Sequence, residues 1–216
     1  MKGGPPRAVL LSAALWTWLA WSGGAFAQTG TAARAPECVA ANDEVTRLRL
    51  GHDRAGRAAP VNPGQAVAAG RRAAGRCSGD NAFLIAYALA RIDLSKDIKG
   101  VSLDNRTSYF NGALADLELV KRRVEARQGA QYEIFNILGL TYYDTRQYEK
   151  SIAVLNEAGP FLNASTTVSR RNTYFTKGMA QYQLGRTAEA ASSFGTASKF
   201  GHPQAARWEA TLRRKK

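Results

Sequence analysis

The stretch from residue 132 to residue 158 reads YEIFNILGLTYYDTRQYEKSIAVLNEA, and it decides the fold. Phe135, Leu138 and Tyr142 are spaced three and four residues apart, so they share one face of a helix. Gly139 lies within that face, where a second helix must approach closely. A polar turn follows at residues 144–147, after which apolar residues resume at the helical period. The stretch therefore predicts a helical hairpin.

A second stretch, RNTYFTKGMAQYQLGRTAEAASSFGTASKFGHP at residues 171–203, carries a similar pattern. Gly178 takes the place of Gly139, and residues 184–187 offer a glycine-containing turn. Ala190, Phe194 and Ala197 then resume the helical spacing. We expect a second helical hairpin here.

Both stretches resemble tetratricopeptide repeats (TPRs), which pair two short helices through the same sparse aromatic, small and glycine positions. The resemblance covers roughly a third of the chain. Two departures stand out: Arg146 occupies a position where the family favours glycine, and Ser151 one where it favours alanine. The resemblance implies a repeat scaffold that binds other proteins.

The remaining segments also read as helices. Prolines and short polar residues mark their starts, as expected for first-turn prolines and N-caps. The expected helices run from Pro36 to about Leu50, from Asn62-Pro63 to Cys77, from Asp80 to Leu94, from Thr107 or Ser108 to about Gln128, and after Pro203.

No segment alternates apolar and polar residues over a length that demands a sheet, so the predicted fold class is all-α. The architecture expected is a TPR-like solenoid of helical hairpins, closed by a C-terminal capping helix that carries Trp208. The predicted organisation is a signal peptide at 1–27, an N-terminal hairpin at 28–80, a helical pair interpretable as a degenerate repeat at 81–130, two TPR-like repeats at 131–203, and a capping helix with a basic tail at 204–216.

The first 27 residues have the form of a signal peptide. Lys2 and Arg7 precede an apolar run, and Ala25-Phe26-Ala27 ends it with small residues at the recognition positions. A membrane anchor is the alternative, but the run of about 14 residues is shorter than the roughly 20 that a span needs. We therefore expect a periplasmic or secreted protein without a transmembrane span after cleavage.

Export favours a disulfide between the two cysteines, Cys38 and Cys77. One lies near the start of an expected helix and the other at the end of the next helix. Antiparallel packing would bring the two sulfurs together. Two separate buried thiols are the alternative.

The formal net charge is +13, and removal of Lys2 and Arg7 with residues 1–27 leaves +11. Anionic partners are compatible with this charge, but the basic clusters are scattered and match no nucleic-acid motif. The expected partner is another protein or a peptide segment, and one interpretation of the charge is that this partner is acidic. Nucleic acid is not an expected partner.

Candidates for catalysis are few. His52 and His202 belong to no metal-binding or nucleophile motif, and His202 beside Pro203 reads as a turn or capping residue. We expect neither a metal nor a cofactor, and no enzyme activity. The expected function is a scaffold for protein–protein interaction. The alternatives are an accessory subunit of a cell-envelope enzyme or assembly machine, and a small hydrolase with a degenerate site.

In TPRs the first helix of each hairpin lines the concave surface, so the resemblance indicates a partner-binding groove. Its aromatic and apolar members predict a groove that accepts the hydrophobic face of a helix or an extended segment. Packing of these side chains against one another, or under the helix that carries Trp208, is the equally weighted alternative. The groove residues are Asn136, Leu140, Tyr143, Asn172, Phe175, Met179 and Tyr182.

Overall fold

A computed structural model describes residues 34–52, 58, 60–97, 100–124, 131–159 and 167–214. Throughout these residues the regular structure is helical, with one isolated antiparallel bridge between His52 and Ala58. The all-α prediction is thus confirmed, while the predicted signal peptide lies outside the described residues. The helices are α2 (Pro36–Leu50), α3 (Pro63–Cys77), α4 (Asn81–Ser95), α5 (Leu103–Val124), α6 (Gln131–Asp144), α7 (Tyr148–Glu157), α8 (Thr167–Gln183), α9 (Thr187–Lys199) and α10 (Ala205–Arg213).

Three helices begin at the predicted places, and two of them have a side-chain cap. Pro36 opens α2; the Asn62 side chain accepts a hydrogen bond from the Gln65 N–H at 3.0 Å, and Asp80 accepts one from the Phe83 N–H at 2.9 Å. The predicted start of the next helix at Thr107 or Ser108 is wrong. α5 begins earlier, at Leu103, where the Ser102 hydroxyl accepts the Asn105 N–H at 3.4 Å and the Ser102 carbonyl accepts the Arg106 N–H at 2.9 Å.

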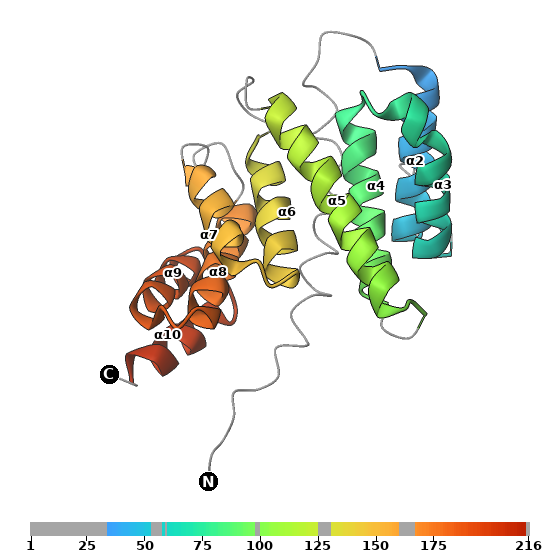
Figure 1. Cartoon of the computed structure of the whole chain (residues 1–216). Coiled ribbons are helices and arrows are strands. Elements are labelled where there is room, and N and C mark those ends of the chain that lie inside the picture. Colours follow the sequence, from blue (N-terminus) through green and yellow to red (C-terminus); the bar gives the residue numbers. More distant parts are fainter. Residues whose placement is uncertain are drawn as a thin grey trace.

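Consecutive helices pack against each other along the whole array (Figure 1). α2 with α3, α4 with α5, α6 with α7, and α8 with α9 form four hairpins, and α10 packs on α9. The first helices of neighbouring hairpins also meet, α2 with α4 and α6 with α8. α4 is buried along the whole of its run from Phe83 to Ala90, in which every residue is apolar or a tyrosine.

A disulfide joins Cys38 at the start of α2 to Cys77 at the end of α3, as predicted. The two Cα atoms lie 5.4 Å apart, and both side chains are buried in the core. Because the bridge closes a loop across a sequence separation of 39 residues, the chain-entropy model assigns it roughly 4 kcal/mol of stabilisation. The bond ties the N-terminal hairpin together at one end.

The buried apolar side chains form two cores. The larger one runs through α2–α7, and the smaller one lies within α8–α10 around Phe175 and Phe194. The C-terminal part of the chain therefore has its own core, which α10 closes with Ala205 and Leu212.

Three helical glycines lie where neighbouring helices are closest. A Cβ on Gly178 would lie 2.8 Å from Phe194 Cε1, and one on Gly139 would overlap the Leu155 side chain. Those two contacts lie within the two hairpins that the sequence predicted, at the glycines where close approach of a second helix was expected. Gly70 of α3 makes a third: a Cβ there would overlap the Tyr87 ring of α4. The sequence analysis did not single out Gly70.

Replacing Gly70 with alanine should destabilise the protein by about 1–3 kcal/mol, because the Tyr87 ring must move within a packed core. Gly75 is the matched control on the same helix. It is exposed and has no atom within 4 Å of a built Cβ, so Gly75→Ala should stabilise by about 0.5–1 kcal/mol through helix propensity alone. Urea unfolding measures both. Equal effects of the two substitutions would contradict the close approach at Gly70.

The turns after α6 and α8 share one backbone geometry. In each, an N–H reaches back five residues to a carbonyl: Gln147 to Tyr142 at 2.8 Å, and Arg186 to Gln181 at 2.9 Å. This geometry places one residue in the left-handed region. Gly185 takes it at φ 75°, but in the first hairpin Arg146 takes it at φ 61°. The departure from the TPR pattern therefore leaves a strained residue.

Substituting Arg146 with glycine should raise the free energy of unfolding by about 1 kcal/mol, because glycine adopts this conformation without steric cost. Arg146→Ala is the control, since it removes the charged side chain but keeps the Cβ. Thermal or urea denaturation should rank the glycine variant above both the alanine variant and the wild type. If the alanine variant gained as much stability as the glycine variant, removal of the arginine side chain would explain the gain, and the left-handed backbone conformation would not.

Candidate interaction face

The predicted groove residues lie on α6 and α8, which pack against each other. They are not equally accessible. Asn136, Phe175 and Met179 are buried, whereas Leu140, Tyr143, Asn172 and Tyr182 are partly exposed. The four partly exposed residues are here named the α6–α8 face.

Phe175 and Met179 belong to the C-terminal core. The Phe175 ring stacks on the His202 ring with centroids 3.8 Å apart and lies 5.4 Å from that of Phe194. The rings of Tyr182 and Trp208 make an edge-to-face contact with their centroids 5.2 Å apart. The alternative interpretation was that groove side chains pack under the helix that carries Trp208. The positions of Phe175, Met179 and one side of the Tyr182 ring agree with this alternative.

The contacts between α6 and α8 include polar pairs as well as apolar ones. Ser169 donates a hydrogen bond to Glu133 Oε1 at 3.0 Å, and Thr173 donates one to Asn136 Oδ1 at 3.3 Å. Burial raises the pKa of the Glu133 carboxyl, and the Ser169 hydrogen bond opposes this shift. We call these two pairs the polar seam. Sequence reasoning missed it, because short polar residues facing another helix leave no periodic apolar signal.

Tyr143 lies at the end of this seam. It packs against the C-terminal core, and its ring lies 5.6 Å from that of Tyr148. Burial raises the pKa of Tyr143 to about 12, partly offset by a side-chain hydrogen bond with Gln183. The phenol therefore stays protonated at neutral pH and can donate a hydrogen bond there.

Two partly buried ion pairs connect the first helices of the N-terminal hairpins with α6. Arg49 Nε lies 3.5 Å from Asp93 Oδ2, and Lys96 Nζ lies 2.8 Å from Asp144 Oδ2. Burial lowers the pKa of Lys96 and raises the pKa of Asp144, while the attraction between the two opposes both shifts. Asp93 and Lys96 are three residues apart at the end of an otherwise apolar helix. Residues with this spacing lie side by side on a helix, so the sequence could have indicated that these two charged residues take part in ion pairs.

No cluster of three or more His, Cys, Asp or Glu side chains with metal-site geometry occurs among the described residues. Within the same residues, no helix combines the length and apolar character needed to cross a bilayer. Comparison with protein-family models, curated proteins and solved structures yields no match to this chain.

His202 takes the turn position that the sequence predicted, between α9 and α10. Its Nδ1 accepts a hydrogen bond from the Gln204 N–H at 3.3 Å, and its ring lies on Phe175. Burial, together with the charge of Arg171, lowers the pKa of His202 to about 4. The imidazole is thus neutral in the folded protein at neutral pH.

This shift predicts destabilisation in mild acid. Between pH 6.5 and about 4 the unfolded chain protonates at His202 while the folded chain does not, so stability is complete above this window and falls within it. The expected loss is about 2–3 kcal/mol. The measurement is the free energy of unfolding in urea at several pH values.

His202→Asn is the control variant, because an amide oxygen can still accept the Gln204 N–H but does not titrate. The buried carboxyls with raised pKa values, Glu133 among them, shift stability in the opposite direction in both proteins. The difference between the two pH profiles therefore isolates His202. Parallel profiles would show that His202 does not titrate as described.

Proposed function

We propose that this protein is an exported, non-catalytic scaffold of TPR-like helical hairpins that binds a segment of another protein on the α6–α8 face. The observation that carries the proposal is the repeated hairpin geometry. In α6–α7 and α8–α9 a glycine admits a large side chain of the second helix, and the same five-residue turn follows the first helix. Such repetition is typical of solenoid proteins, whose first helices form a binding surface.

Two further features support the architecture and the compartment. The outward side chains of α10 are small or polar, among them Ala206, Arg207 and Thr211, as expected for a terminal capping helix. The disulfide between Cys38 and Cys77 is typical of proteins in an oxidising compartment such as the periplasm or the extracellular space. A role as an accessory subunit of an envelope complex is one form of this scaffold function.

The chemistry of the α6–α8 face suits a mixed partner segment rather than a purely apolar one. Leu140 offers apolar surface, while the Tyr143 and Tyr182 rings combine apolar faces with hydroxyl groups. Asn172 makes no side-chain hydrogen bond within the described part of the chain, so its amide is available to a partner backbone. An extended segment with alternating apolar and polar side chains meets these requirements.

The test is site-specific crosslinking in the native host. A photoreactive amino acid at Asn172 should capture a defined partner protein. The same group at Asn156, an exposed position on α7, should not. Capture of the same partner from both positions, or from neither, would contradict the assigned face.

Binding of the captured partner then provides a quantitative check. The double substitution Leu140→Glu with Asn172→Glu should weaken binding roughly tenfold or more, because charges would be buried without partners. Ala153→Glu with Asn156→Glu on α7 adds the same charge at exposed positions and should leave binding nearly unchanged. Melting temperatures of both variants verify that the fold survives.

A further inference from the structure

The positive charge of this chain is concentrated in its last helices. Residues 28–166 contain eighteen Lys and Arg against fifteen Asp and Glu, which nearly balance. Residues 167–216 contain ten Lys and Arg against two Glu. Solubility alone would not require this imbalance, since dispersed charge serves it equally well.

The two acidic residues in α8–α10 offset only two of these ten positive charges. Glu189 accepts a hydrogen bond from Gln181 at 3.1 Å, and Glu209 is paired with Arg213 at 2.9 Å. Arg186 is paired with Glu149 of α7 at 2.6 Å. Five cations of this unit form no ion pair with any described residue: the half-buried Arg171, and Lys177, Lys199, Arg207 and Arg214.

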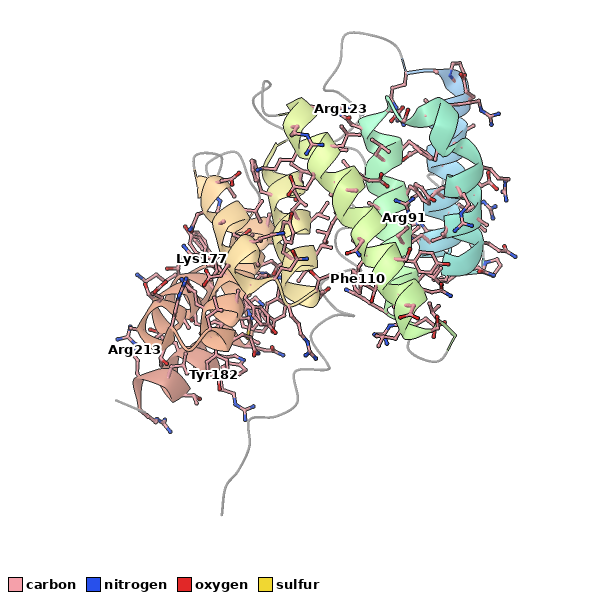
Figure 2. The ribbon with its side chains drawn as sticks, viewed as in Figure 1. Arg91, Phe110, Arg123, Lys177, Tyr182 and Arg213 are labelled. Carbon is pink, nitrogen blue, oxygen red and sulfur yellow. A yellow bond between two sulfur atoms is a disulfide. The ribbon has the colours of Figure 1, made fainter. Side chains whose placement is uncertain are left out.

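Four of these cations, Lys177, Lys199, Arg207 and Arg214, come from three helices and from the residue after α10. Lys177 lies on α8, Lys199 on the last turn of α9, and Arg207 on α10. Figure 2 shows Lys177 on the side of the unit near α7 and Arg213 on α10, farther from it. A flexible chain can adapt its path to cations that several helices contribute.

The aromatic side chains of the unit argue against two other polyanions. Each ring from Tyr174 to Trp208 packs against another ring, as in the Tyr174–Phe200 stack and the contact between Phe194 and Trp208. Rings paired in this way do not form a row of free faces on which successive unpaired bases could stack. None of these rings is well exposed, as insertion into a lipid interface would require. The large apolar residues that are well exposed in the described chain, Val61 and Leu103, belong to other hairpins.

We propose that α8–α10 is a basic docking unit for an acidic, flexible polypeptide segment of a partner protein. Carboxylates of the segment would pair with Lys177, Lys199, Arg207 and Arg214 around the outside of the C-terminal core. This surface differs from the α6–α8 face, and its test does not depend on that face. The interaction is electrostatic and therefore weakens as salt screens it.

The test uses the purified protein and a labelled peptide of alternating Glu and Ser, about 20 residues long, as the probe. The triple variant Lys177→Glu, Lys199→Glu and Arg207→Glu should bind this peptide roughly tenfold or more weakly. The control variant, Arg71→Glu, Arg76→Glu and Arg122→Glu, changes the net charge equally at exposed positions of α3 and α5 that also lack ion pairs. It should lose much less affinity.

Equal losses in the two variants would show that net charge, and not the C-terminal unit, attracts the peptide, and would overturn the proposal. So would an absence of peptide binding by the wild type at low salt. The wild type is also tested against phosphatidylglycerol vesicles and against an oligothymidylate of equal charge. If it binds either of these more tightly than the peptide, that ligand class, and not an acidic polypeptide, is the partner of α8–α10, and the proposal is overturned. A second variant with Gln at positions 177, 199 and 207 covers the case in which the glutamates disturb folding.

Discussion

The close approach of helices at glycine is the constraint on which the rest of the structure depends. At Gly70, Gly139 and Gly178 the neighbouring helix places an aromatic ring or a leucine where a Cβ would stand. The large residue gains burial on all sides because the glycine removes the obstacle. Each contact thus fixes the separation of two helices, within a hairpin at Gly139 and Gly178 and between two hairpins at Gly70.

The contacts that join the two cores include polar pairs as well as apolar packing such as that of Tyr143. Within each core the packing is apolar, but the polar seam between α6 and α8 consists of short hydroxyl side chains that meet Glu133 and Asn136. Such pairs contribute little net free energy, since water competes for the same groups in the unfolded chain. They do, however, require one alignment of the two helices, because a shifted register would leave the buried groups without partners. The seam therefore contributes alignment more than stability.

Sequence reasoning succeeded where the signal was local. The starts of α2, α3 and α4 follow from Pro36, Asn62-Pro63 and Asp80, and the antiparallel arrangement of α2 and α3 placed the two cysteines together. It failed where partners come from distant segments. The pairing of Lys96 with Asp144 spans two hairpins, and the burial of Phe175 depends on His202 from the turn after α9. Whether a side chain on a first helix faces solvent or another helix is settled by such contacts, which spacing alone does not encode.

The separate closure of the C-terminal core has a consequence for how such a chain can change in length. Because α10 seals α8 and α9 within a core of their own, a duplicated hairpin inserted before α8 would leave both existing cores intact. The inserted unit would need a hydroxyl-bearing face toward α6 and an acceptor-bearing face toward α8 to reproduce the seam on both sides. It would also need side chains that replace Tyr143 and α7 in their packing against the C-terminal unit. Evolution or design could therefore extend the array at this joint without rebuilding either end.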